Sequence, residues 1–270
     1  MPAPTVQSPP FGCTILGSGS HGNATVIHGP EGNLLLDEGF SKIDICRRLE
    51  NVSIDPASLR AILITHLHGD HVHPTGCAAF AREFSLPVYF TQKVLPLPEK
   101  KHFNAPPDIL YFLDDSPFDL CGVRIEPFMV SHDVPTVGFT FSAGGHRIGY
   151  ATDLGFVSPL VKKRLTGCDL LVLESNYDTR MLRMSNRDPD TKRRIEGDCG
   201  HLGNTQSMNA LEELLSQNTR YLVLAHISGE CNDPELVANR TKERLTELDR
   251  RDVAFFLAKQ DTPLPTFQLG

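Results

Sequence analysis

Four side chains able to bind a metal ion lie within the stretch HLHGDH, and they are His66, His68, Asp70 and His71. Such crowding is energetically costly unless a cation compensates it. Neutral imidazoles and an ionised carboxylate suit Zn²⁺, and they suit Mn²⁺ or Fe²⁺ where more oxygen ligands are present. Because one loop cannot encircle an ion, the stretch predicts part of a metal site whose other ligands lie elsewhere in the chain.

Three further candidate ligands each follow a hydrophobic run: His132 in MVSHD, Asp153 in YATDLG and His226 in LVLAHIS. Together with the histidine stretch they provide enough ligands for two divalent metal ions. These ligand types favour Zn²⁺, with Mn²⁺ and Fe²⁺ as alternatives. Any one of these histidines alone would more simply be a hydrogen-bonded polar residue. The prediction of a metal site therefore depends on the combination of the histidine stretch with the three later residues.

Strands must position these ligands, because hydrophobic runs precede each of them. The apolar run 61–65 is typical of a strand buried on both faces, and it leads directly into the histidine stretch. The other predicted strands are 11–16, 24–28, 33–37, 86–91, 123–130, 137–141, 147–152, 169–174, 221–225 and 253–257. The predicted helices are 41–51, 74–84, 158–165, 205–216 and 234–248. In the first helix, the residues expected to face inward are Ile43, Ile45, Cys46 and Leu49.

Length and composition favour one α/β domain. A chain of 270 residues with 40% hydrophobic content can bury one large core, so we expect a single domain over residues 1–270. Both halves are rich in strands and carry helices that must pack outside them. This arrangement predicts a four-layer αββα sandwich.

The sequence also indicates a compartment. No run approaches the ~18 consecutive apolar residues of a membrane span, and the opening MPAPTVQSPPFG lacks the basic and apolar regions of a signal peptide. The seven cysteines form no CxxC pair, which fits neither a disulfide framework nor a cysteine-rich zinc site. We therefore expect a cytoplasmic protein without membrane contact. The sequence does not indicate whether the protein has protein partners.

The stretch THLHGDH, followed downstream by His, Asp and His, resembles the metallo-β-lactamase superfamily across nearly the whole chain. The resemblance implies the αββα fold of that family and two metal sites. The implied ligands of one ion are His66, His68 and His132, those of the other are Asp70, His71 and His226, and Asp153 bridges the two. Common zinc β-lactamases carry Cys where this chain has Asp153, whereas hydrolases of phosphodiesters and thioesters carry Asp. Asp37 resembles the buried acidic residue that supports the histidine loop in this family.

A narrower resemblance lies in ESNYDTRMLRMSN, KRRIEGDCGHLGN and GSGSHGN. These stretches are similar to those of the bacterial YycJ (WalJ) group, whose members are regarded as 5′-to-3′ DNA exonucleases. Tyr177 stands where that group has His, and NRDPDT replaces its usual stretch before KRRI. The resemblance implies DNA as the substrate.

A cluster of cations fits such a substrate, although the net charge of −7 argues weakly against nonspecific attraction to nucleic acid. Its members are Arg180, Arg183, Arg187, Lys192, Arg193 and Arg194. They could position a phosphate backbone. The alternative is a solvated surface whose cations pair with nearby acids, which are Asp178, Asp188, Asp190 and Glu196.

Other polar residues are candidates for substrate contact. Backbone amides and hydroxyls in the glycine-rich loop 17–23 could bind an anion, although a tight turn explains the loop almost as well. The remaining candidate substrate contacts are Ser18, Ser20, Asn23, Asn176 and Asn204. His201 could act as a general acid, or it could belong to the N-cap region of the following helix.

These observations lead to a hypothesis of phosphodiester hydrolysis by a hydroxide held between two metal ions ~3.5–4 Å apart. Asp70 and Asp153 would orient that hydroxide, and His201 would assist the leaving group. One alternative keeps the metals but changes the substrate to a small thioester, lactone or cyclic phosphate. Two others are a di-iron redox centre, which normally needs an electron-carrying partner domain, and a nucleic-acid-binding module with a purely structural metal. The ligand set is open, however, whereas a structural metal is held in a closed tetrahedral cage.

Overall fold

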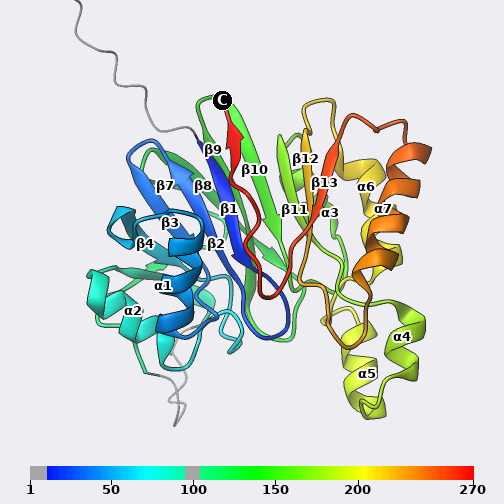
Figure 1. The fold of residues 1–270 in the computed structure, drawn as a ribbon, viewed down its shortest axis with the longest axis horizontal. Coiled ribbons are helices and arrows are strands. Elements are labelled where there is room, and N and C mark those ends of the chain that lie inside the picture. The colour runs from blue at the N-terminus through cyan, green and yellow to red at the C-terminus, as the bar shows by residue number, and fades with distance from the viewer. Residues whose placement is uncertain (1–10, 95–103) are drawn as a thin grey trace, which may run out of the picture.

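The computed structural model describes residues 11–94 and 104–270, which form two β-sheets packed face to face with helices outside both (Figure 1). The first sheet has the strand order β14-β1-β2-β3-β4-β5-β6. Its strands are β1 (Phe11–Gly17), β2 (Ala24–Gly29), β3 (Gly32–Leu36), β4 (Leu59–Leu63), β5 (Val88–Thr91), β6 (Ile109–Phe112) and β14 (Phe267–Leu269). From β14 to β3 neighbouring strands are antiparallel, and from β3 to β6 they are parallel.

The second sheet has the order β13-β12-β11-β10-β9-β8-β7. Its strands are β7 (Phe118–Leu120), β8 (Val123–Val130), β9 (Thr136–Ala143), β10 (His146–Ala151), β11 (Leu170–Glu174), β12 (Tyr221–Ala225) and β13 (Ala254–Leu257). The strands β7 to β10 are antiparallel, whereas β10 to β13 are parallel. As a result β8, β10, β11 and β12 all run in the same direction and end at the same edge.

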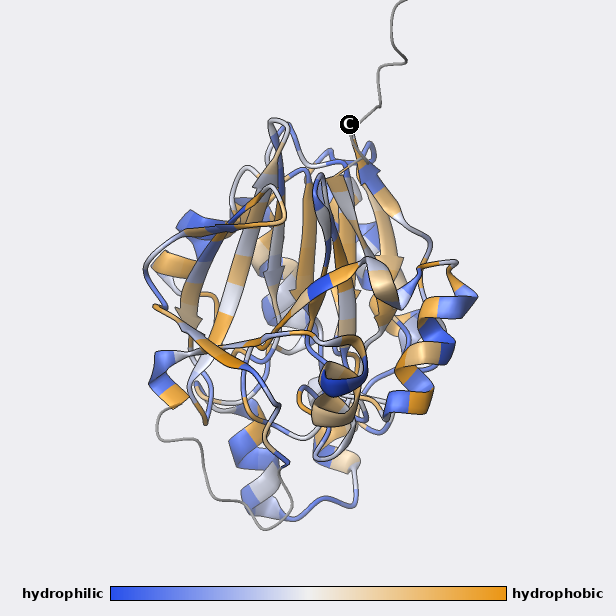
Figure 2. Cartoon of the chain, turned by 90° about the vertical axis from the view of Figure 1, so that its left-hand side faces the viewer, coloured by the Kyte–Doolittle hydropathy of each residue, from blue (hydrophilic) through white to orange (hydrophobic). Residues whose placement is uncertain are grey.

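The main core lies between the two sheets, where side chains alternate along each strand. Leu34 and Leu36 of β3 belong to this core together with Phe139 and Phe141 of β9, and all four side chains are fully buried. Leu35, between the first two, points to the opposite face of its sheet and joins a second cluster there. Figure 2 shows hydrophobic residues along the strands and hydrophilic residues on much of the helix surface.

Helices cover both outer faces of the sandwich (Figure 1). The helices are α1 (Lys42–Asn51), α2 (Gly76–Phe84), α3 (Pro159–Leu165), α4 (Thr179–Met184), α5 (Pro189–Glu196), α6 (Asn204–Leu214) and α7 (Pro234–Glu247). Apolar residues of α1 and α2 pack on the first sheet, and those of α3, α6 and α7 pack on the second. The predicted αββα sandwich is therefore confirmed. No helix in the parts of the chain described above combines the length and hydrophobicity needed to cross a membrane.

The expected inward face of α1 was partly wrong. Ile43 is 77% exposed, whereas Ile45 and Leu49 are buried as predicted. The third buried residue is Arg48, whose guanidinium lies 3.8 Å from the ring centroid of Phe40 and donates to the carbonyl of Leu16 at 2.8 Å. The helix therefore buries the face defined by positions 45, 48 and 49, which turns Ile43 to solvent.

The short helices α4 and α5 were not predicted. Each buries one residue of its own, Leu182 and Ile195 respectively, so neither has the apolar periodicity that identifies a helix in a sequence. These two residues form a small cluster with Tyr177 and Cys231, separate from the main cores. Asp178 and Asp188 cap the two helices by accepting backbone amide hydrogens with their side chains.

Candidate metal centre

Strand ends bring the predicted ligands together. The histidine loop follows β4, His132 follows β8, Asp153 follows β10 and His226 follows β12. Within each sheet these strands run in the same direction, so their carboxyl ends meet at one edge. The seven predicted metal ligands all lie in the groups of converging ligand atoms that the structure contains there.

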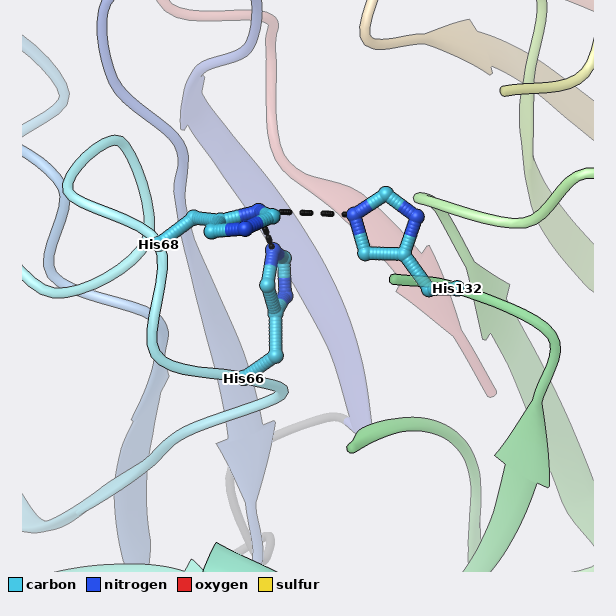
Figure 3. Close-up of side chains that lie close together, drawn as sticks. All are labelled: His66, His68 and His132. Atoms are coloured by element: carbon cyan, nitrogen blue, oxygen red, sulfur yellow. Dashed lines mark hydrogen bonds between the residues drawn. The ribbon is translucent and has the colours of Figure 1, made fainter. Parts of the chain in front are cut away.

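The first group consists of three imidazoles, which Figure 3 shows pointing toward one another. Nε2 of His66 lies 3.1 Å from Nδ1 of His68, and Nε2 of His132 lies 3.4 Å from the same atom. Nitrogen ligands ~2.0–2.1 Å from a tetrahedral zinc ion are separated by about 3.3–3.4 Å. The spacing of the three nitrogens therefore fits one ion.

The second group consists of Asp70, His71 and His226. Oδ2 of Asp70 lies 3.3 Å from Nε2 of His226 and 3.7 Å from Nε2 of His71. Oδ2 of Asp153 lies 3.2 Å from Nε2 of His71 and has no hydrogen-bond partner in the described chain, although it is buried. An orphaned carboxylate oxygen in a cluster of imidazoles is what a bound cation would satisfy, so the residues present fit metal ions.

A second polar atom fixes the orientation of each of the five candidate histidine ligands. His71 donates from Nδ1 to Asp37 at 2.7 Å, and His132 donates from Nδ1 to the carbonyl of Gly200 at 3.0 Å. His66 has Nδ1 3.0 Å from Oγ1 of Thr65. In each case the opposite nitrogen faces the cluster. Hydrogen bonds of this kind set the tautomer and ring orientation of metal-ligating histidines.

Asp37 is placed as the family resemblance implies. Besides binding His71, its carboxylate accepts the backbone amide of Thr65 at 2.8 Å and the hydroxyl of the same residue. It is fully buried, and it lies at the end of β3, beside the strand that leads into the histidine loop. Asp37 therefore connects the first turn of that loop to the sheet.

Glu174 has a comparable role that sequence reasoning missed. It is fully buried at the end of β11, and its Oε1 accepts from Nδ1 of His226 at 2.7 Å and from Nδ1 of His201 at 2.9 Å. Its Oε2 accepts the backbone amides of Leu154 and Leu202 at 3.1 and 3.0 Å. The signal in the sequence was an acidic residue ending a strand of otherwise apolar residues, in the same kind of position as Asp37.

Asp133 is another residue that sequence reasoning passed over. Its Oδ1 lies 3.3 Å from Nε2 of both His68 and His132, and its Oδ2 accepts from Arg194 at 2.6 Å. Since Nε2 of His68 contacts Asp133, its Nδ1 is the nitrogen that faces His66 and His132. Asp133 also links this group to α5, which carries Arg194.

Burial and charge act against each other throughout the cluster. Burial alone would raise the pKa of Asp153, but His226 and His71 outweigh it and hold that pKa well below its usual value. Burial lowers the pKa of His226, but Asp153 and hydrogen bonds to Asp70 and Glu174 raise it to about 10. The pKa of His71 is likewise raised, because the charges of Asp153 and Asp37 outweigh the effect of burial. Burial and the charge of His71 lower the pKa of His66. The carboxylates thus favour the protonated forms of His71 and His226, and bound cations would take the place of these protons.

Three residues at strand ends adopt the left-handed backbone conformation that non-glycine residues rarely occupy. They are Asp37, Asp153 and His226, with φ of 59°, 58° and 54°. Such residues cost of the order of 1–3 kcal/mol each and concentrate at functional sites. In this structure the conformation turns the chain sharply as it leaves the sheet, with all three side chains in the cluster.

The predicted polar substrate contacts fall into two classes. Ser20 is exposed, whereas Ser18, Asn23, Asn176 and Asn204 are buried. Ser18 donates to Asn23 at 2.8 Å and accepts the amide of His226 at 2.9 Å, and Asn176 donates to the carbonyl of His226 at 2.7 Å. Asn204 accepts from Ser175 and Asn232. These four side chains thus hold the loops around the cluster in place.

Most of the predicted phosphate-binding cations have protein partners. Arg183 pairs with Glu196, Arg187 with Glu230, Arg193 with Asp190 and Arg194 with Asp133. Lys192 donates to the carbonyls of Arg183 and Ser185. Arg180 has no ion-pair partner among residues 11–94 and 104–270. Much of this cluster is therefore a surface whose cations pair with acidic residues, which was the alternative interpretation of the sequence.

Comparisons with known proteins agree with the geometry. The family profile described as "Beta-lactamase superfamily domain" matches residues 33–227. The chain is 32% identical to the Exodeoxyribonuclease YycJ of Bacillus anthracis, over 87% of this chain and 89% of that protein. It is 31% identical to the Exodeoxyribonuclease WalJ of Streptococcus pneumoniae, over 88% of this chain and 90% of that protein.

A solved structure extends the likeness of the fold. The metallo-beta-lactamase fold protein YhfI from Bacillus subtilis superposes with a TM-score of 0.71 at 17% identity, covering 95% of this chain and 99% of that one. The predicted resemblance, fold and enzyme class are thus confirmed. The chain belongs to the metallo-β-lactamase superfamily and is a metal-dependent hydrolase related to the YycJ and WalJ proteins.

Proposed function

We propose that the protein is a single-domain, cytoplasmic exonuclease that uses two divalent metal ions to remove nucleotides from the 5′ end of DNA. The observation that carries the proposal is the convergence of two ligand groups, three imidazoles on one side and Asp70, His71 and His226 on the other, next to buried Asp153. The names of the YycJ and WalJ relatives support DNA as the substrate.

The two ions would be held by the two groups, with Asp153 shared between them. A set of five imidazoles and two carboxylates favours Zn²⁺, with Mn²⁺ or Fe²⁺ as the alternatives. Bound in this way, two divalent ions supply an activated water and neutralise the charge that develops on the phosphoryl oxygens.

The chain's own residues supply positioning and proton transfer. Asp70 and Asp153 are the carboxylates that would orient the attacking water. His201 stands beside both metal groups, since its ring centroid lies 5.2 Å from that of His132 and 5.3 Å from that of His226. Because its Nδ1 donates to Glu174, its Nε2 is free to exchange a proton with the leaving oxygen.

Metal-reconstituted protein tests this proposal when it is incubated with 5′-end-labelled and 3′-end-labelled DNA, single- and double-stranded, and with RNA of the same sequence. The expected result is release of the 5′ label as a mononucleotide at the first cleavage, and progressive shortening of the 3′-labelled strand. Release from the 3′ end would contradict the direction. Hydrolysis of a small thioester, lactone or cyclic phosphate without any action on DNA would favour the alternative substrate class.

A further inference from the structure

A cavity of about 220 Å³ is lined by Ile227, the residue that follows the candidate ligand His226, and by Ser20 and His21 of the loop after β1. Three segments enclose it: the loop after β1, the segment after β12 and the residues around the end of β13. Its walls are largely apolar, with Ile227, Pro234, Leu257 and Ala258 among them. Pockets for drug-sized ligands occupy roughly 300–1,000 Å³, so this one suits a single planar ring.

Chain connectivity joins this cavity to the metal centre. Ile227 in its wall directly follows His226, and the amide of His226 donates to Ser18, which belongs to the same loop as Ser20 and His21. Both the cavity and the candidate metal centre are therefore formed by the loop after β1 and the segment that begins at His226.

Hydrogen bonds keep the cavity open and its shape defined. The amide of His21 donates to Oε1 of Gln260 at 2.9 Å, and Nε2 of Gln260 donates to the carbonyl of Gly22 at 3.0 Å. The amide of Ser18 donates to the carbonyl of Lys259 at 3.0 Å. The loop after β1 is thus attached to the segment after β13 at three points, and the cavity lies between the two.

Polar and charged side chains remain available at the rim. Ser20, His21 and Lys259 are exposed, and none of these side chains forms a hydrogen bond or ion pair within the described chain. An imidazole can stack on a base, and an unpaired lysine attracts the phosphate of a neighbouring nucleotide. An apolar pocket with an aromatic ring and a cation at its entrance has the chemistry that a nucleobase with its backbone requires.

We propose that this cavity binds the base of the nucleotide whose phosphate lies at the metal centre, with His21 stacking on the base and Lys259 contacting the backbone. The proposal rests on the proposed nuclease function. It adds a site for the base, formed by residues that play no part in metal binding.

Calorimetric titration of the zinc-loaded protein with thymidine 5′-monophosphate and with 2-deoxyribose 5-phosphate tests the proposal, because these probes differ only in the base. The nucleotide should bind about tenfold more tightly, which is the usual size of one base-stacking contact. In His21→Ala this preference should fall severalfold, whereas Lys163→Ala, which removes an exposed lysine on α3, should keep it.

Gly229→Leu is a second variant at the lining of the cavity, and a Cβ added there meets no protein atom within 4 Å, so the substitution should leave the fold intact. The added side chain should abolish the preference for the nucleotide while the affinity for the sugar phosphate stays the same. Equal binding of the two probes by the wild-type protein, or an unchanged preference in both His21→Ala and Gly229→Leu, would overturn the proposal. Failure of the nuclease function itself shows separately, as absence of DNA hydrolysis by the wild-type protein.

Discussion

Replacing Glu174 by glutamine should weaken metal binding although Glu174 belongs to neither ligand group of the proposed two-metal centre. The carboxylate accepts four hydrogen bonds, two from imidazoles at Oε1 and two from backbone amides at Oε2. A glutamine has one acceptor oxygen and a donor NH₂ group. If its oxygen stays with the backbone amides, its NH₂ group faces Nδ1 of His226 and His201.

The consequence for His226 follows from its tautomer. Nδ1 must then accept a hydrogen bond, so the remaining proton moves to Nε2, the atom that lies 3.3 Å from Asp70 on the metal side. A protonated Nε2 cannot bind a metal ion. Substitutions of this kind typically cost 10–100-fold in metal affinity, which corresponds to about 1.4–2.7 kcal/mol.

Competition with a chromophoric chelator measures the affinity of each site, and circular dichroism checks that the variant folds. Glu126→Gln is a matched control, because Glu126 also accepts from several side chains, including Arg147 and Arg164, but contacts none of the metal groups. We expect the loss for Glu174→Gln only. Wild-type affinity in that variant, or an equal loss in both variants, would refute the reasoning.

Three further predictions concern the metal, the shared carboxylate and the DNA. Asp153→Ala should abolish DNA hydrolysis while the circular dichroism spectrum stays native, and full activity in this variant would contradict the assignment. Removal of metal by a chelator should lower the melting temperature by about 10 °C, because an ion at ~1,000 times its dissociation constant stabilises the folded protein by about 4 kcal/mol. Scanning fluorimetry of the metal-free and the metal-restored protein measures this shift. An unchanged melting temperature would count against bound metal. Arg180→Ala should reduce the slope of log affinity for DNA against log salt by about one, as expected for one lost phosphate contact, whereas Lys163→Ala should leave the slope unchanged.

Local sequence patterns were sufficient to identify the seven side chains that converge in the candidate metal centre. Hydrophobic runs identified β4, β8, β10 and β12, and a His or Asp just beyond such a run is visible without any knowledge of the fold. The αββα layers also followed from local patterns, because each half of the chain repeats strands flanked by helices.

The supporting residues depend on contacts that sequence alone does not show. Glu174 acts on His201 and His226 only because β11 lies next to β12 and the segment before α6 returns beside it. Asp133 and Arg194 meet although 61 positions separate them. The ion pairs made by the cationic residues could be identified only once the positions of α4 and α5 were known. Neither helix has enough buried residues to be recognised from its sequence.

The edge of the first sheet has a consequence for folding during synthesis. Its outer strand β14 pairs with β1, with Phe11 opposite Leu269. The strand β1 is therefore synthesised long before the strand that pairs with its outer edge. Until that strand is made, β1 exposes backbone N–H and C=O groups without hydrogen-bond partners, together with side chains that are buried in the folded protein. An exposed strand of this kind can pair with strands of other chains and cause aggregation. In the interval between the synthesis of β1 and that of β14, this edge should depend on protection by chaperones.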